Sequence, residues 1–230
     1  MKYISDFFGL LFPRKCCICG ATLVEFEKSI CSGCLLDLPL ADTAKNKNNN
    51  VEQRFFGRIP IEAATAMLNF KHGNKVQTLL HQIKYAGNEE AAITMGRQLG
   101  IWITQCGRFD DVDILVPVPL HRSKERKRGY NQSMLLCKGI IQTFQRPISN
   151  GNLIRIKKTD SQTNKNREER LNNMEGVFCL LDEKAFENKH ILLVDDVITT
   201  GATTEACYMA MEKVEGLKIS IASLAVAGYI

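Results

Sequence analysis

Hydrophobic residues recur along most of the chain in two alternating patterns. Short, nearly continuous apolar runs predict strands at residues 63–70, 113–118, 152–156, 176–180, 190–196 and 217–227. Longer stretches carry apolar residues at helical spacing and predict helices at 74–87, 91–106, 131–144 and 201–214. Strands that are apolar throughout are buried on both faces, as in parallel sheets. The pattern therefore predicts an α/β fold, with a mostly parallel sheet covered by helices on both faces.

Three regions differ in composition, and they suggest how the chain is divided. Residues 1–43 combine an apolar start with a cysteine cluster, and we interpret the start as a short amphipathic helix that docks on its own domain. Residues 44–61 begin with a polar, asparagine-rich stretch, which is typical of a linker or a long surface loop. Residues 62–230 hold the predicted sheet and helices. The chain of 230 residues is 45% hydrophobic and 24% charged, which argues against disorder and fibres.

The cysteines indicate a metal site. The sequence has Cys16-x-x-Cys19 and Cys31-x-x-Cys34, and four thiolates at this spacing suit a tetrahedral zinc ion. Such a site has no open coordination position, so the zinc would be structural. Cys17 is the spare cysteine of the cluster. The remaining cysteines stand singly in apolar settings and are interpreted as buried thiols: Cys106, Cys137, Cys179 and Cys207.

Compartment and membrane contact follow from what the sequence lacks. No apolar run approaches the ~20 residues that a membrane helix needs, and no cleavage site follows the apolar start. We therefore expect no membrane span and a reducing cytoplasm, where a metal site is favoured over a disulfide pair or a redox motif. The net charge of +5 permits contact with phosphates or nucleic acid without requiring it.

Two neighbouring acids end the predicted strand at 190–196. Asp195 and Asp196 precede a small-residue loop, with Gly201 just before the next predicted helix. Ligands of open parallel sheets bind at the carboxyl ends of strands, and a helix N-terminus suits a phosphate group. The carboxylates would then serve ribose hydroxyls, or a magnesium ion bound to a diphosphate. The alternative is an ordinary strand-to-helix turn in which a threonine caps the helix.

A basic stretch follows the predicted strand at 113–118. Five of the seven residues from 122 to 128 are Arg or Lys, and Pro117 and Pro119 restrict the path of the chain before them. Cations at a strand's carboxyl end would hold a pyrophosphate group. The alternative is a solvated basic turn, which is the better interpretation of any single Lys or Arg here. His121 alone is as well explained as a surface or capping residue.

The stretch ILLVDDVITTGATT (191–204) closely resembles the phosphoribosyl-pyrophosphate (PRPP) loop of type I phosphoribosyltransferases. The resemblance implies that Asp195 and Asp196 hold the ribose hydroxyls and are the candidate catalytic residues, and that Thr199 to Thr203 surround the 5′-phosphate. Purine-salvage members have an acid where this chain has Thr199, so hypoxanthine or guanine salvage is disfavoured. The implied PRPP-binding residues are Asp195, Asp196, Val197, Thr199, Thr200, Gly201, Ala202 and Thr203.

Further motifs resemble one subfamily, the ComF or GntX-like proteins (competence protein F). They are PVPLH (117–121) with RGYNQ (128–132), IKYAG (83–87), and the polar stretch after residue 156. The resemblance implies an N-terminal zinc ribbon, a pyrophosphate loop and a mobile hood over the site. The implied loop residues are Val118, Pro119, Leu120, His121 and Arg122. The implied hood residues are Lys158, Gln162, Arg167 and Arg170.

The same resemblance implies two functional hypotheses. In the first, the protein binds PRPP or a nucleotide, with magnesium, and takes part in natural competence, meaning the uptake and handling of single-stranded DNA. It would then be a possible phosphoribosyltransferase whose acceptor the sequence does not identify. In the second, the fold is a non-catalytic module that binds single-stranded DNA and a helicase partner. Basic residues at 122–128 and 157–170 fit a DNA backbone, but Tyr130 is the only aromatic residue near them.

Overall fold

The computed structural model describes residues 13–41, 43–157 and 176–228 of the chain. In chain order, the helices, 3-10 helices (η) and strands are α2 (Ser32–Leu36), η1 (Glu52–Arg54), β1 (Ala63–Phe70), α3 (Lys75–Tyr85), α4 (Glu89–Cys106), β2 (Ile114–Pro117), α5 (Arg122–Arg128), α6 (Gln132–Ile140), β3 (Leu153–Arg155), β4 (Phe178–Leu180), η2 (Lys184–Phe186), β5 (His190–Ile198), α8 (Ala202–Met209) and β6 (Lys218–Ala227).

The centre of the fold is a four-stranded sheet in the order β1-β6-β5-β2, in which each neighbouring pair is parallel. This confirms the α/β fold class and the parallel sheet that the apolar runs predict. The strands at 152–156 and 176–180 are also present, as β3 and β4. They do not join the main sheet, but pair antiparallel with each other as a separate two-stranded unit.

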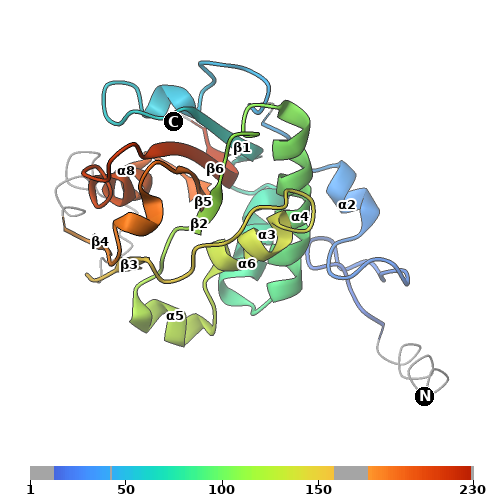
Figure 1. Cartoon of the computed structure of the whole chain (residues 1–230). Helices are drawn as coiled ribbons and strands as arrows, with labels where there is room; N and C mark the ends of the chain where they lie inside the picture. The colour runs from blue at the N-terminus through green and yellow to red at the C-terminus, as the bar shows by residue number, and fades with distance from the viewer. Residues whose placement is uncertain (1–12, 42, 158–175, 229–230) are drawn as a thin grey trace.

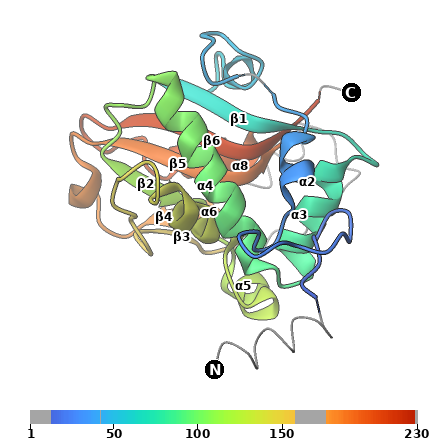
Figure 2. The same cartoon turned by 90° about the vertical axis from the view of Figure 1, so that its right-hand side faces the viewer.

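Helices cover both faces of the sheet. In Figure 2, α4 and α6 lie in front of the strands and α8 lies behind them. Successive residues of β5 point to opposite faces, so Leu192 and Val194 join the core under α3, α4 and α6. Leu193 joins the second core, which is shared with α8, β3 and β4. This arrangement places both layers within reach of side chains at the carboxyl end of β5.

The expected linker is packed against the sheet. Val51 and Phe55 are fully buried in the second core, and Ile59 is nearly so. One of its asparagines, Asn49, is buried and binds the backbone. The Asn49 amide donates to the carbonyls of Thr43 and Ala64, and its side-chain oxygen accepts from the N–H of Val51 at 2.9 Å. Polar composition does not predict this packing, because the Asn49 side chain is hydrogen-bonded inside the protein.

The basic stretch after β2 is helix α5, where the sequence suggested a loop. His121 caps its start, with Nδ1 accepting from the Ser123 N–H at 3.2 Å. Gly129 ends it in the left-handed conformation, at φ 90°, and donates to the Glu125 carbonyl. Long unbranched side chains favour the helix, and cations in its last turn interact well with the helix dipole. A count of basic residues alone does not contain this information.

Close contact between α4 and α6 depends on glycine. A Cβ added at Gly139 would lie 2.2 Å from the Ile93 carbonyl oxygen and 2.7 Å from the Gly96 Cα. We therefore expect Gly139→Ala to lower the free energy of unfolding by roughly 1–3 kcal/mol, since the two helix backbones must separate. Chemical denaturation measures the change. Lys138→Ala, on the exposed side of α6, is the control and should change stability by no more than about 0.5 kcal/mol. Equal effects of the two variants would contradict the packing argument.

Candidate functional site

The two acids near the end of β5 are buried, and they point to opposite faces of the sheet. Asp195 and Asp196 are 8% and 5% exposed. Because side chains alternate along a strand, Asp196 points toward the α3 layer and Asp195 toward the β3 layer. Each layer supplies a cation. Lys84 approaches from α3 and Arg155 approaches from β3, and both line the same pocket as the acids.

Lys84 forms an ion pair with Asp196, with Nζ 3.0 Å from Oδ2. Burial disfavours the ammonium form of Lys84, but the charge of Asp196 outweighs burial and raises the pKa of Lys84. The stretch IKYAG, which contains Lys84, resembles the family motif, but the sequence does not indicate which acid Lys84 meets. Strands β1 and β2 run parallel in one sheet, so the chain between them must return from the carboxyl edge to the amino edge. The Lys84–Asp196 contact places the end of α3 at the carboxyl edge, which leaves the return to α4.

Asp195 is the more perturbed of the two acids. Its burial, together with the negative charge of Asp196, raises its pKa to about 7. The charges of Lys84 and Arg155 and the N–H of Asp196 act in the opposite direction, but they do not cancel the burial. Burial lowers the pKa of Arg155, and its guanidinium lies 5.3 Å from the centre of the Phe178 ring. Two buried acids held between two cations are expensive to maintain, which is typical of a functional site.

A pocket of about 680 Å³ opens over these groups at the carboxyl edge of the sheet. Its lining combines the two acids and part of the following loop with cations from α3, β3 and α5, and Lys84 of α3 is paired directly with Asp196. Among its lining residues are Lys84, Val118, Pro119, Leu120, Lys124, Lys127, Arg128, Arg155, Asp195, Asp196, Val197, Thr199 and Thr203. Acids and cations in one pocket suit a ligand that carries both hydroxyl and phosphate groups.

The loop after β5 leads into an open helix start. Gly201 adopts φ 81° and is the N-cap of α8, so the N-cap residue has no side chain that could accept from the first N–H groups of the helix. The nearest substitute is the Thr200 hydroxyl, which accepts from the Ala202 N–H at 3.4 Å. The first N–H groups of α8 are therefore available to a ligand, and the helix dipole adds positive potential there.

The structure separates some residues that the resemblance groups together. Val118, Pro119 and Leu120 line the pocket with the acids, whereas His121 and Arg122 line a neighbouring pocket of about 440 Å³. Thr199 and Thr203 reach the main pocket, while Thr200, Gly201 and Ala202 are not among its lining residues. The hood residues Lys158, Gln162, Arg167 and Arg170 lie outside the described residues.

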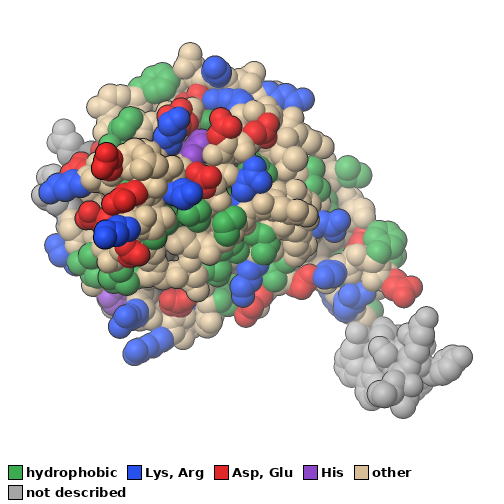
Figure 3. All heavy atoms as spheres, in the orientation of Figure 1, with side chains coloured by type: hydrophobic (Ala, Val, Ile, Leu, Met, Phe, Trp, Pro, Cys, Tyr) green, Lys and Arg blue, Asp and Glu red, His purple; other side chains and the backbone are tan. Residues whose placement is uncertain are grey.

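Helix α5 adds positive charge beside the pocket. Lys124, Lys127 and Arg128 line the pocket, while Arg122 and Arg126 are exposed. Figure 3 shows Lys and Arg side chains over this helix at the lower edge of the molecule. The expectation that the basic stretch places cations at the carboxyl edge of the sheet is met, although by a helix.

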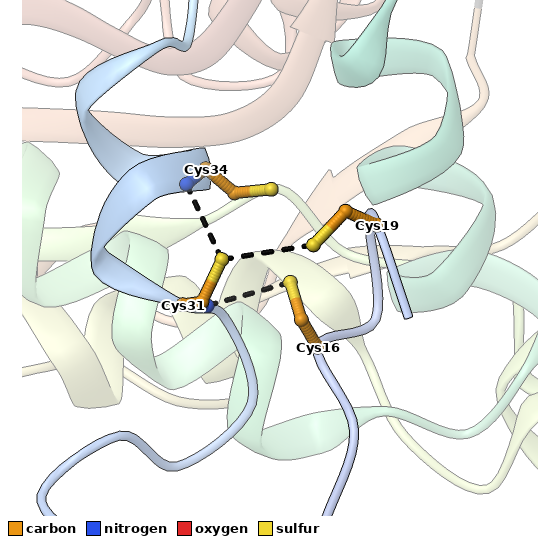
Figure 4. Close-up of side chains that lie close together, drawn as sticks. All are labelled: Cys16, Cys19, Cys31 and Cys34. Carbon is orange, nitrogen blue, oxygen red and sulfur yellow. Dashed lines mark hydrogen bonds between the residues drawn. The ribbon is translucent and has the colours of Figure 1, made fainter. Parts of the chain in front are cut away.

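The cysteine cluster has the geometry of a metal site. The sulfur atoms of Cys16, Cys19, Cys31 and Cys34 all lie within 4.8 Å of one another, and Figure 4 shows the side chains converging. Cys19 and Cys31 Sγ are 3.7 Å apart. Zn–S bonds of ~2.3 Å imply sulfur–sulfur distances of about 3.8 Å in a tetrahedron, whereas a disulfide needs about 2.05 Å. The four residues therefore fit zinc.

Protonation in the cluster also suits metal binding. Burial disfavours ionisation of Cys16, but the backbone N–H groups of Cys19 and Cys31 outweigh it and lower the pKa of Cys16 to about 6. Burial and the neighbouring sulfurs raise the pKa of Cys34 instead. The lowered pKa makes Cys16 a ready first ligand, because a metal binds the thiolate form of cysteine.

The cluster packs against the large domain. Cys16, Cys34, Leu23 and Ile30 belong to the same core as α3 and α4. The Ser29 hydroxyl also donates to Asn88 at 2.9 Å, just before α4. Of the single cysteines, Cys137 and Cys207 are buried as expected, while Cys106 and Cys179 are only partly buried. No helix in the described ranges is both long and apolar enough to cross a bilayer.

Comparison with known proteins agrees with these features. The phosphoribosyl transferase domain family matches residues 133–228, which include β5, its loop and α8. Competence protein F of Haemophilus influenzae is 25% identical over 223 residues, which cover 93% of this chain and 97% of that protein.

Two further relatives match over a shorter part. DNA utilization protein YhgH of Escherichia coli K12 is 30% identical over 128 residues, covering 54% of this chain and 56% of that protein. Competence protein ComFC of Bacillus subtilis is 36% identical over 110 residues, covering 46% and 42%. The matched part thus spans about half the length of these two relatives. The chain is thus similar to competence proteins of the ComF type, matches the phosphoribosyl transferase domain family over residues 133–228, and carries an N-terminal four-cysteine cluster that fits a zinc ribbon.

Proposed function

We propose that the pocket at the carboxyl edge of the sheet binds PRPP or a nucleotide of the same 5-phosphoribosyl type. The observation that carries the proposal is that Asp195 and Asp196 share one pocket with Thr203 at the start of α8, whose N-cap is Gly201, and with cations of α3, β3 and α5. Carboxylates accept hydrogen bonds from ribose hydroxyls, and helix N–H groups bind a phosphate. A phosphorylated pentose carries both hydroxyl and phosphate groups and therefore suits both parts of the pocket.

Each part of the pocket has a role in this proposal. Asp195 and Asp196 hold the ribose hydroxyls, and the loop from Thr199 to Thr203 surrounds the 5′-phosphate. Lys84 and the cations of α5 face the diphosphate, and magnesium would accompany that group as an additional counterion. If the diphosphate leaves, these same cations stabilise the departing charge, while the acids orient the sugar as positive charge builds at its ring oxygen.

Calorimetry with PRPP and magnesium tests the proposal directly. We expect a heat of binding for PRPP, a weaker one for ribose 5-phosphate, and a further one for pyrophosphate alone, because the loop and the cations are separate parts of the pocket. Ribose without phosphate is the control and should give no heat. Absence of heat for every phosphorylated pentose would contradict the proposal. Pyrophosphate release in the presence of candidate bases or amines would add transferase activity to it.

The wider role that we propose is in the uptake and use of DNA in the cytoplasm. The names of the relatives, competence proteins and a DNA utilization protein, support it. The exposed cations of α5, which include Arg122 and Arg126, support direct contact with single-stranded DNA. In the alternative, the domain is a non-catalytic module that binds single-stranded DNA and a helicase partner.

A DNA-uptake assay with the double variant Asp195→Asn and Asp196→Asn separates these two roles. Loss of uptake with partner binding intact would support the ligand-binding role. Unchanged uptake would support the non-catalytic module. The dependence of single-stranded DNA affinity on salt tests the contact itself, and a flat slope would exclude an electrostatic path along α5.

A further inference from the structure

Arg58 links the segment before β1 to the loop after β5. Its Nη1 donates to the carbonyl oxygens of Arg54, at 2.8 Å, and Thr200, at 2.7 Å. Its Nη2 forms an ion pair with Glu205 in the first turn of α8. The side chains of Arg58 and Glu205 are only 13% and 15% exposed. Figure 1 shows the segment around Arg58, in blue and cyan, along the β1 side of the sheet.

The contact with Thr200 sets the orientation of one peptide group. The described chain has no cis peptide bonds, and in a trans peptide the carbonyl and the following N–H point in opposite directions. Arg58 draws the Thr200 carbonyl toward itself, so the Gly201 N–H points away from Arg58. Rotation of this peptide would break a charge-assisted hydrogen bond.

Phe55 supports the same loop from the same segment. A Cβ on Gly201 would lie 2.7 Å from Cε1 of the buried Phe55 ring, so the ring packs directly on the glycine backbone. Arg58 and Phe55 thus contact consecutive residues of the loop from one side. The loop has a rigid support where the sequence suggested a linker.

Arg58 also balances a charge near the proposed phosphate site. Glu205 lies in the first turn of α8, where its carboxylate alone would repel a bound phosphate group. The ion pair neutralises this carboxylate and turns it toward Arg58. The Arg58 guanidinium therefore fixes the direction of the Gly201 N–H and reduces the repulsion between Glu205 and a phosphate at the start of α8. Both effects favour phosphate binding.

We propose that Arg58 is a positioning residue for the 5′-phosphate: it orients the Thr200–Gly201 peptide so that its N–H faces the ligand. This inference rests on the proposed function of the pocket and adds the group that prepares its loop. Arg58 lies outside every motif that the resemblance supplied.

The test compares two probes on the full-length protein, because they occupy different parts of the pocket. For Arg58→Met we expect at least a tenfold loss of ribose 5-phosphate affinity by calorimetry, and little change for magnesium pyrophosphate, which faces Lys84 and α5. The size follows from the loss of one charge-assisted contact and the release of one carboxylate, roughly 1.4 kcal/mol or more. Thermal unfolding is recorded in parallel.

Arg108→Met is the matched control. Arg108 forms a comparable ion pair with Glu52, at 13% and 6% exposure, and it contacts the same segment at a point away from the pocket. This variant should lose stability without losing ribose 5-phosphate affinity. If both variants weaken ribose 5-phosphate equally, or if Arg58→Met weakens both probes equally, the effect is general loosening and the inference fails.

Two further variants keep the test decisive if Arg58→Met does not fold. Arg58→Lys retains the charge and one contact, so its loss of ribose 5-phosphate affinity should be smaller than tenfold but measurable. Glu205→Gln keeps the contact with Thr200 and should bind at least as tightly as the wild type. Weaker ribose 5-phosphate binding by Glu205→Gln would overturn the inference about Arg58 and leave the proposed function in place. Wild-type affinity for ribose 5-phosphate in both Arg58→Lys and Arg58→Met would do the same. A wild-type protein that binds no ribose 5-phosphate would overturn the proposed function as well.

Discussion

Asp195→Asn is expected to stabilise the protein above pH 7 while it weakens binding of PRPP by about 10- to 100-fold. Both effects come from the same buried carboxylate. Its hydrogen bonds to ribose hydroxyls would be charge-assisted, and losing them costs about 1.5–3 kcal/mol of binding free energy. Denaturant unfolding from pH 4 to pH 8 and calorimetry at pH 8 measure the two changes.

The sign of the stability change follows from the pKa of Asp195. Burial and the charge of Asp196 raise it from the ordinary value of 3.8 to about 7 in the folded protein. The folded state therefore holds the proton more tightly than the unfolded state. As pH rises from about 4 to about 7 the carboxylate opposes folding progressively, and above pH 7 the full penalty is present. Asparagine removes it, so we expect a gain on the order of 1–3 kcal/mol at pH 8 and little gain at pH 4.

In the wild type, PRPP affinity should rise as pH increases through about 7, because the ionised form of Asp195 accepts hydrogen bonds from the ribose hydroxyls. Asp111→Asn, an exposed acid at the opposite edge of the sheet, is the control and should change neither property. A destabilised Asp195→Asn protein at pH 8 with undiminished PRPP affinity would contradict both the buried charge and its role.

Cys34→Ser is expected to remove the metal ion and to unfold residues 13–41, at a cost of several kcal/mol. Metal affinity in such sites is folding free energy, because the ligands are not assembled in the unfolded chain. The loss should extend beyond the cluster, since Leu23, Ile30 and Leu38 belong to the same core as α3 and α4. Metal analysis should find one zinc ion per wild-type chain and much less in the variant. Hydrogen exchange should be faster at residues 13–41 and in α3.

Cys17→Ser provides the matched control. Cys17 is adjacent to Cys16 but is not one of the four converging residues, so this variant should keep its zinc and its exchange protection. Removing zinc from the wild type with a chelator should reproduce the Cys34→Ser exchange pattern. If Cys34→Ser retained a full equivalent of zinc and normal stability, the four-cysteine site would be wrong.

Local patterns predicted the elements well and their partners poorly. The apolar run at 63–70 matches β1 residue for residue, and the run at 217–227 differs from β6 by one residue. The basic stretch predicts a loop or turn where the structure has helix α5, and capping, one of the alternatives for His121, is what the structure shows. The segment 44–61 was misjudged because Asn49 and Glu52 satisfy backbone groups and an ion pair inside the protein.

The candidate site shows the same division. The sequence places Asp195, Asp196 and Thr199 in one candidate site because they follow one another on one strand and its loop, and all three line the pocket. Lys84 and Arg155 were not found, because they come from other elements. Helix positions near the end of α3 carry no sign of which strand they will meet, and the pairing of Lys84 with Asp196 depends on α3 staying at the carboxyl edge.

The sequence by itself determined most of the segments that form strands and helices, that two acids lie near the carboxyl end of a strand, and which four cysteines can share a metal. These properties depend on neighbours a few residues apart, through periodicity and spacing. Only the tertiary structure decided that Arg58 meets Glu205, 147 positions away, and that β3 and β4 leave the main sheet. Such contacts depend on how whole elements pack, and packing depends on the combined shape of many side chains, which no local pattern contains.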